Sequence, residues 1–247
     1  HLICWRGGLR LKRIIVFCTV LFALLSALLY NINRLAVPAT AYLPAADVVV
    51  IDAGHGGEDG GATVNSVRES ELNLAVARRL EAMLGLFGTK TVMTRDSEDI
   101  AYPAEAKTTR ERKRADQKAR VELINSCGAA VLISIHQNKY PDTAPRGAQV
   151  LYSGMDGSRQ LAELMQDGLV AELDSANRRT AAKIPEDIFL MRSVSCTAVL
   201  VECGFMSNPS ELTLLSDDVY QQRIAAILTA SYLQYRLCAG ENGNGKS

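Results

Sequence analysis

Closely spaced cysteine pairs are missing from this sequence, although six cysteines occur along its 247 residues. No two of them form a C-x-x-C pair, and their spacings show no regularity. Thiolate zinc sites and disulfide frameworks depend on such spacings, so both are weak explanations for this chain. Scattered buried thiols are the favoured interpretation.

The sequence also has no formal net charge, because 27 basic residues balance 27 acidic ones. The balance hides an asymmetry: residues 1–46 contain five basic residues and no acid. Residues 47–247 therefore hold 22 basic and 27 acidic residues, a formal charge of −5. Such a region lacks a nucleic-acid footprint, and we expect no nucleic-acid partner. The basic run from Lys107 to Arg120 is interleaved with acids, which favours a solvated helix face.

An uncharged segment of 17 residues, Ile14 to Tyr30, follows the first basic residues. It is just long enough to cross a bilayer, and the positive charges before it predict a cytoplasmic N-terminus. Ala39-Thr40-Ala41 has the pattern of a signal-peptidase site, and cleavage near Ala41 would release a secreted protein. An uncleaved anchor is favoured, because the apolar run is longer than that of a typical signal peptide.

Three regions follow from this pattern. Residues 1–46 are expected to form a basic stub, the membrane segment and a proline-bearing linker. Residues 47–238 are expected to form one extracytoplasmic domain, and residues 239–247 a polar tail.

Continuous apolar runs alternate with amphipathic segments through the domain. Unalternated runs are typical of strands buried on both faces, and apolar residues at every third or fourth position indicate helices. The expected strands are residues 48–51, 90–95, 129–136, 147–153 and 198–202, and helices are expected at 70–87, 109–125, around 161–173 and around 220–235. This order predicts an α/β domain with a mainly parallel sheet flanked by helices.

The stretch VVVIDAGHGGEDGG, Val48 to Gly61, places a glycine-rich loop after the first strand. It lacks the Lys-Ser/Thr of a P-loop and breaks the G-x-G-x-x-G spacing, so a nucleotide site is a poor interpretation. The alternative is that the glycines permit a tight turn that presents His55, with Asp52 behind it to orient the imidazole.

Only three histidines occur, and two of them, His55 and His136, follow apolar strands. In an open α/β sheet, sites assemble at the carboxyl ends of the strands, so the two imidazoles can share a metal. Glu69 is a third candidate ligand, with Glu58 and Asp59 as rivals that spacing alone does not separate. Glu202 also ends an apolar strand and is a candidate general base. Pairing of Glu202 with an arginine such as Arg192 is the structural alternative.

Four blocks carry a resemblance, in this order: VVVIDAGHGGEDGGA, RESELNLAVARRL, VLISIHQN and AVLVECGFMSNPSE. Together they resemble the zinc-dependent N-acetylmuramoyl-L-alanine amidase family, type 3. The resemblance implies a twisted, mostly parallel six-stranded sheet. It also implies one Zn²⁺ held by His55, Glu69 and His136, with Glu202 as the catalytic glutamate. Two departures are visible, Ala53 in place of the usual proline and Ser195-Cys196-Thr197 where a proline often stands.

The resemblance also implies a substrate, peptidoglycan. The family cleaves the amide between the lactyl group of muramic acid and L-alanine of the stem peptide. Asn138, Asn208 and Arg192 are weaker candidates for substrate binding, with loop capping as the alternative for the asparagines. An accessory activating protein is a further partner to consider.

The short architecture and the helix from Arg110 resemble the germination-specific spore cortex amidases. A role on the cortex side of the forespore, in muramic-δ-lactam formation, is therefore expected. The alternatives are a vegetative autolytic amidase, an inactive wall-binding scaffold on the same fold, and a zinc peptidase acting on the same substrate.

Overall fold

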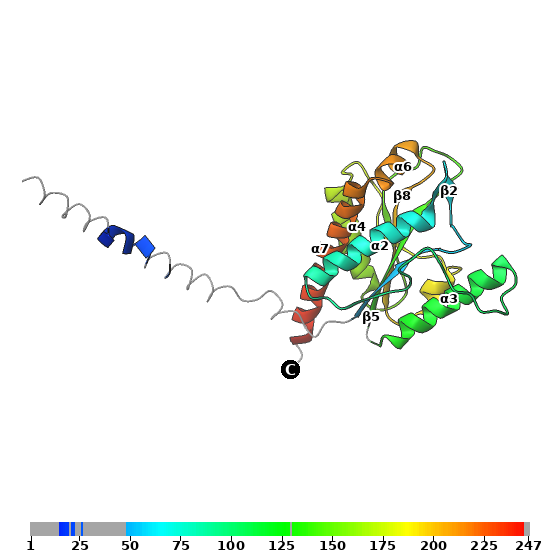
Figure 1. Ribbon diagram of the computed structural model, residues 1–247, viewed down its shortest axis with the longest axis horizontal. Coiled ribbons are helices and arrows are strands. Elements are labelled where there is room, and N and C mark those ends of the chain that lie inside the picture. Colours follow the sequence, from blue (N-terminus) through cyan, green and yellow to red (C-terminus); the bar gives the residue numbers. More distant parts are fainter. Residues whose placement is uncertain (1–14, 20, 23–25, 27–47, 129, 245–247) are drawn as a thin grey trace, which may run out of the picture. The chain divides into compact units, whose positions relative to one another are not determined.

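A computed structural model describes residues 15–19, 21–22, 26, 48–128 and 130–244 (Figure 1). The chain divides into two compact units, His1–Tyr42 and Leu43–Ser247. Within the described residues, no helix is long and apolar enough to span a bilayer. The predicted membrane segment, residues 14–30, falls mostly outside the described residues, and the processing site near Ala41 falls wholly outside them. Both stay predictions.

A six-stranded sheet forms the centre of the second unit, with the order β4-β1-β5-β8-β6-β7. Strand β6 runs antiparallel to β8, and every other pairing is parallel. The strands are β1 (Val48–Ala53), β4 (Thr91–Met93), β5 (Ala130–Asn138), β6 (Gln149–Tyr152), β7 (Ala182–Lys183) and β8 (Thr197–Phe205). The predicted mostly parallel, six-stranded α/β fold is confirmed.

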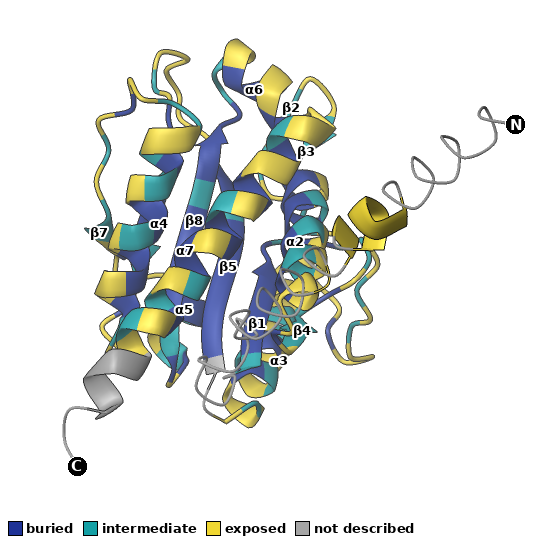
Figure 2. Ribbon diagram, turned by 90° about the vertical axis from the view of Figure 1, so that its left-hand side faces the viewer, coloured by how far each residue is buried: buried dark blue, intermediate teal, exposed yellow. Residues whose placement is uncertain are grey.

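Helices cover both faces of the sheet (Figure 2). The helices are α2 (Glu69–Leu86), α3 (Thr109–Ser126), α4 (Ser158–Glu172), α5 (Phe189–Ser193), α6 (Pro209–Leu215) and α7 (Asp218–Asn244). Val49 and Ile51 of β1 belong to the core under α2, α4 and α7, whereas Val50 belongs to the core under α3 and α5. Because successive side chains of a strand point to opposite faces of the sheet, each of them packs in one of the two cores.

Local signals explain the principal helix ends. Helix α3 begins with a capping box, in which Thr108 and Glu111 satisfy each other's backbone amides. Gly88, with φ of 72°, follows the end of α2 in the left-handed conformation that glycine adopts most readily. Hydrophobic periodicity does not reveal the short elements, which are the hairpin of β2 (Thr63–Val64) and β3 (Val67–Arg68), strand β7, and helices α5 and α6. Helix α7 continues to Asn244, beyond the expected start of the tail.

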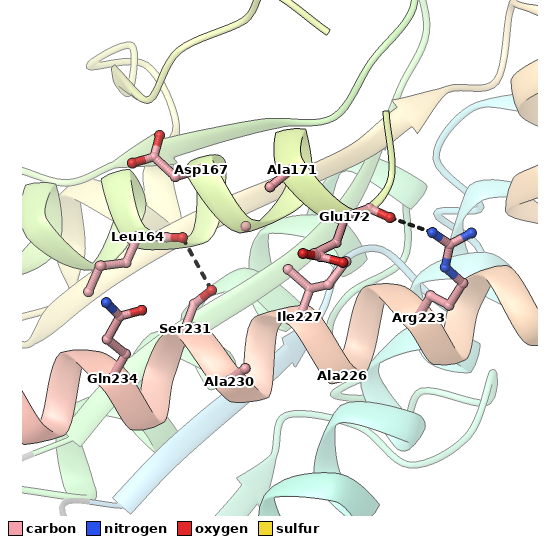
Figure 3. Close-up of a pocket in the computed structure, with 11 residues that line it drawn as sticks. Leu164, Asp167, Ala171, Glu172, Arg223, Ala226, Ile227, Ala230, Ser231 and Gln234 are labelled. Carbon is pink, nitrogen blue, oxygen red and sulfur yellow. Dashed lines mark hydrogen bonds between the residues drawn. The ribbon is translucent and has the colours of Figure 1, made fainter. Parts of the chain in front are cut away.

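A groove of ≈ 610 Å³ runs along the seam between α4 and α7 (Figure 3). Small residues such as Gly168, Ala226 and Ala230 are among those that line it, and Ser231 donates a hydrogen bond to the carbonyl of Leu164 at 3.2 Å. The groove lies on the side of the sheet that α2, α4 and α7 cover. The polar cluster described below lies instead at the carboxyl ends of the central strands.

Candidate metal centre

Polar side chains gather where the central strands end. Register pairs Asp52 of β1 with Ser134 of β5, and His136 of β5 with Glu202 of β8. Paired residues project to the same face, and here that face is the one covered by α3 and α5. One edge of the sheet therefore carries an imidazole and a carboxylate side by side.

His55 reaches the same place from the loop that follows β1. Its φ is 62°, a left-handed conformation uncommon for residues other than glycine. A bridge between Gly56 and Asp59 tightens the turn after it. The result is an edge-to-face arrangement of the His55 and His136 rings, with centroids 5.0 Å apart and an interplanar angle of 76°.

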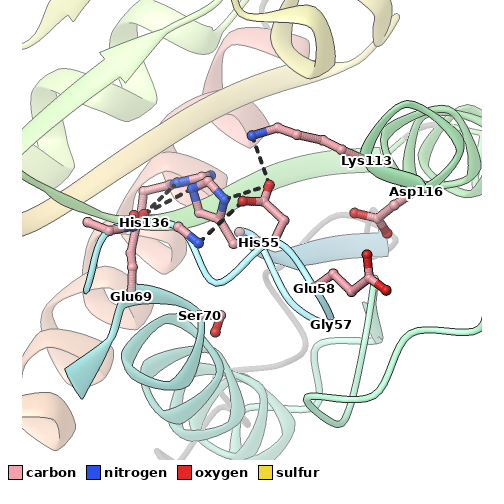
Figure 4. A network of polar contacts seen from close by, with 12 residues as sticks. His55, Gly57, Glu58, Glu69, Ser70, Lys113, Asp116 and His136 are labelled. Carbon is pink, nitrogen blue, oxygen red and sulfur yellow. Dashed lines mark hydrogen bonds and ion pairs between the residues drawn. The ribbon is translucent and has the colours of Figure 1, made fainter. Parts of the chain in front are cut away.

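Glu69 connects the two histidines (Figure 4). As the first residue of α2 it is buried, with 4% exposure, and a helix N-terminus stabilises its carboxylate. Its Oε1 lies 3.3 Å from His55 Nε2 and 3.1 Å from His136 Nδ1, and its Oε2 accepts a hydrogen bond from the Ala62 amide at 2.9 Å. The ligand atoms of these three residues all lie within 4.8 Å of one another.

The cluster fits a tetrahedral divalent metal such as zinc. Two imidazoles and one carboxylate are a donor set that catalytic zinc sites use, leaving one position open. The backbone is shaped closely to this set. A Cβ at Gly54 would lie 2.2 Å from His136 Nε2, and a Cβ at Gly61 would lie 2.5 Å from Glu69 Oε2. Only glycine fits at either position without moving a candidate ligand.

Asp59 contacts the ring atom of His55 that faces away from Glu69. Nδ1 of His55 lies 3.0 Å from Asp59 Oδ2, so Nε2 is the nitrogen that faces the cluster. This arrangement of carboxylate, histidine and metal position is common in metalloenzymes, where it fixes the tautomer and the ring orientation. Asp59 is therefore placed behind a candidate ligand and is not itself one of the three clustered donors.

The charges of the cluster stabilise one another. Burial lowers the pKa of His55, but hydrogen bonds to the carboxylates of Asp59 and Glu69 outweigh it and raise this pKa to about 9. Burial likewise opposes ionisation of Glu69, yet hydrogen bonds from His136 and His55 hold its pKa well below the usual range. A proton on His55 is therefore held between the carboxylates of Asp59 and Glu69.

Glu202 differs from the other acids because its Oε2 is buried without a hydrogen-bond partner. Burial raises the pKa of this carboxyl. The expected alternative, a pair with Arg192, is not formed. Arg192 instead lies over the Phe189 ring at 5.6 Å and donates to the Glu186 carbonyl at 3.5 Å.

A cavity of ≈ 330 Å³ opens over the cluster. His55, His136 and Glu202 are among the residues that line it. Its walls come from α3 and from the segment that leads into α5, through the residues Lys113, Asp116, Gln117, Asp187, Ile188 and Phe189. A substrate in this cavity would meet both imidazoles and the unpaired carboxylate.

One expectation about the acids near the loop is wrong. Asp52 does not orient the imidazole. It accepts hydrogen bonds from Ser134 at 2.6 Å and Arg120 at 2.8 Å, because strand alternation turns it toward α3. The basic helix α3 is largely a solvated face, as expected, with Lys113, Arg114 and Lys118 exposed, but Arg120 is an exception at 5% exposure. The burial of Arg120 could not be predicted, because an apolar pattern at helical spacing does not reveal a buried arginine.

The rival ligand Glu58 lies outside the three clustered donors. Arg112 and Thr109 of α3 hold its carboxylate. Of the weaker substrate-binding candidates, Asn208 caps α6 by accepting from the amides of Ser210 and Glu211. Neither Asn138, Asn208 nor Arg192 lines the cavity over the cluster.

A histidine, glutamate and histidine cluster beside an unpaired glutamate is the donor set of a metal-dependent hydrolase. The model of the N-acetylmuramoyl-L-alanine amidase family Amidase_3 matches residues 49–231. The chain belongs to this family, as the four blocks predicted.

Similar proteins include the germination-specific N-acetylmuramoyl-L-alanine amidase of Bacillus subtilis (strain 168), 38% identical over 76% of this chain and 79% of that protein. The amidase LytC of the same organism is 29% identical over 76% of this chain, but only 35% of LytC is covered. Among solved structures, the CwlD amidase from Clostridioides difficile, in complex with the GerS lipoprotein, matches with a TM-score of 0.74 and 33% identity, covering 76% of this chain and 98% of that one. The predicted resemblance to germination-specific amidases is confirmed.

Proposed function

We propose that this chain is a zinc-dependent N-acetylmuramoyl-L-alanine amidase that removes stem peptides from peptidoglycan. The bond cleaved is the amide between the lactyl group of muramic acid and L-alanine. The observation that carries the proposal is the convergence of His55, Glu69 and His136 beside Glu202. These three donors would hold the metal, and Glu202 would carry the proton chemistry.

The chemistry follows from the positions of these groups. Zinc bound by the three donors would polarise the amide carbonyl and lower the pKa of water. Glu202 accepts a proton from the attacking water and delivers it to the leaving amine as the C–N bond breaks. The products are a free lactyl carboxylate and a stem peptide with a free L-alanine amino group. An unpaired carboxylate suits this role, because no existing hydrogen bond competes for its lone pairs.

We further propose that the reaction serves cortex peptidoglycan of the spore, where loss of the stem peptide precedes muramic-δ-lactam formation. The similarity to a protein described as germination-specific supports this role. The CwlD amidase was solved with a lipoprotein partner, which supports an accessory protein for this chain as well. A vegetative or autolytic role is the competing proposal, and deletion separates them: the cortex role predicts germination failure with normal cell separation.

For localisation, we propose an extracytoplasmic domain behind a membrane anchor at residues 14–30. The uncharged run and the basic residues before it support this placement. Fractionation of cells with N-terminal sequencing tests it. A mature protein that begins after Ala41 would mean secretion, and a protein protected from external protease would contradict the proposal.

The function itself is tested by one digestion. Purified full-length chain, loaded with zinc, is incubated with cortex peptidoglycan, alone and with lipoproteins from the same cells. Mass spectrometry of the products should show intact stem peptides with new L-alanine amino termini. Cuts between amino acids would indicate a peptidase. A zinc-loaded chain that releases no peptide under either condition would contradict catalysis and favour a wall-binding scaffold.

A further inference from the structure

Arg120 of α3 is buried against the His55 loop, defined as residues 54–59. Its side chain is 6% exposed. Nη1 donates to Asp52 Oδ1 and to the Ala53 carbonyl, both at 2.8 Å, and Nη2 donates to the His55 carbonyl at 2.7 Å. Nε faces Asp116 at 3.0 Å. One guanidinium thus joins α3 to the end of β1 and to the loop.

The two carbonyls that Arg120 binds stand on either side of Gly54. His55 follows with φ of 62°, a conformation that is strained for a residue with a Cβ and persists only when its surroundings enforce it. The bond from Arg120 to the His55 carbonyl fixes the peptide group immediately after that strained φ. It thereby determines the direction in which the imidazole leaves the backbone.

A second contact from α3 acts on the imidazole. Lys113 Nζ lies 2.8 Å from Asp59 Oδ2, the same oxygen that lies 3.0 Å from His55 Nδ1 (Figure 4). Lys113 therefore holds the carboxylate that orients the ring. Helix α3 restrains the backbone of His55 through Arg120 and its side chain through Lys113 and Asp59.

Charge neutralisation alone does not explain this geometry. Asp52 and Asp116 suffice to balance the guanidinium, and Asp52 is satisfied further by Thr94 and Ser134. The two carbonyl contacts are additional, and one of them belongs to a candidate ligand. We propose that Arg120 is a positioning residue for the metal ligand His55, with Lys113 as a second, weaker restraint; this inference rests on the proposed function.

Arg120→Lys tests the inference, because lysine keeps the charge beside Asp52 but cannot donate in the planar fork that reaches both carbonyls. Arg114→Lys is the matched control, since Arg114 is an exposed residue of the same helix. Zinc affinity of the full-length chain is measured by competition with a chromogenic chelator. We expect R120K to bind zinc roughly 10- to 100-fold more weakly, the usual effect of losing a partner of a metal ligand, and R114K to match the wild type.

Hydrogen exchange of the metal-free chain supplies a readout that does not need zinc. The amides of Gly56 and Asp59 are bonded within the loop, and the Gly57 amide is bonded to the Glu98 carbonyl. R120K should speed exchange of these amides and leave β5 and β8 protected. If Arg120 had only a structural role, R120K would instead lower the melting temperature and leave the zinc affinity unchanged.

The outcomes separate the two proposals. A wild type that binds zinc together with a folded R120K of unchanged affinity overturns this inference and leaves the proposed function standing. A wild type that binds no zinc overturns the proposed metal chemistry. It also overturns this inference, because His55 would then not be a metal ligand for Arg120 to position. If R120K does not fold, Lys113→Gln replaces a side chain that is 47% exposed and should weaken zinc binding in the same direction by a smaller factor. Unchanged affinity in K113Q together with unchanged loop exchange then overturns the inference.

Discussion

Glu202 and His136 are register partners on the neighbouring parallel strands β8 and β5. Strands lie about 4.8 Å apart, so the carboxylate stands beside the imidazole on the same face of the sheet. Glu202 Oε2 is buried and has no hydrogen-bond partner. Glu202, whose Oε2 accepts no hydrogen bond, thus lies next to the three clustered donors without being one of them.

Replacement of Glu202 by glutamine should separate catalysis from metal binding. Glutamine has nearly the same shape but cannot accept and return a proton, so we expect peptide release to fall by roughly 10²- to 10⁴-fold. Zinc stoichiometry, measured by elemental analysis of the same sample, should match the wild type because the three donors are intact. Retained activity in E202Q, or loss of zinc, would contradict the assigned role.

Gly54→Ala should disable the site through sterics alone. The added Cβ would lie 2.2 Å from His136 Nε2, so the ring must leave the position in which its Nδ1 lies beside Glu69. We expect lower zinc affinity and loss of peptide release. Gly85→Ala is the control, because Gly85 lies in α2 with nothing within 4 Å of the added Cβ. G85A should keep activity and raise the melting temperature slightly, since alanine favours a helix over glycine. Equal activity of G54A and G85A would refute the steric argument.

Acid stability should depend on Asp52. Burial raises the pKa of this carboxyl, but the positive charge of Arg120 and hydrogen bonds from Ser134 and Arg120 lower it to about 2. A folded-state pKa below the unfolded one means stabilisation that is complete above about pH 4 and lost as pH falls toward 2. The contribution is ~2 kcal/mol at neutral pH. Urea unfolding of wild type and Asp52→Asn at several pH values measures it. The difference between them should shrink below pH 4, and a constant difference would exclude this ion pair as the cause.

Zinc binding should release a proton. In the metal-free chain the pKa of His55 is raised to about 9, so at pH 7 its imidazole carries the proton that a metal must displace. The apparent affinity should therefore strengthen as pH rises toward 9, by roughly tenfold per unit for one proton. Calorimetry in buffers of different ionisation enthalpy counts the protons released. Affinity independent of pH between 6 and 8 would show that His55 is neutral before the metal arrives.

Much of the site could be predicted from the sequence, because its signals are local. His55, His136 and Glu202 each follow a continuous apolar run, and the carboxyl ends of parallel strands meet at one edge. Glu69 was less certain than these, since spacing did not separate it from Glu58 and Asp59 before the resemblance was considered. The strand register and the position of α2 distinguish Glu69 from the other two acids. Both depend on contacts between distant parts of the chain.

The sequence by itself determined the alternation of strands and helices, the family and the residues that end the central strands, because hydrophobic period and short motifs are properties of consecutive residues. Only the tertiary structure decided which acid serves which partner. Asp52 turned out to bind Arg120, and Asp59, seven residues further on, lies behind His55. The physical reason is the two-residue period of β1 combined with the turn at Gly57 and Glu58, which the Gly56–Asp59 bridge closes. The first aims Asp52 at α3, and the second brings Asp59 back to the imidazole. No pattern of consecutive residues encodes a buried arginine 68 positions from the carboxylate it binds.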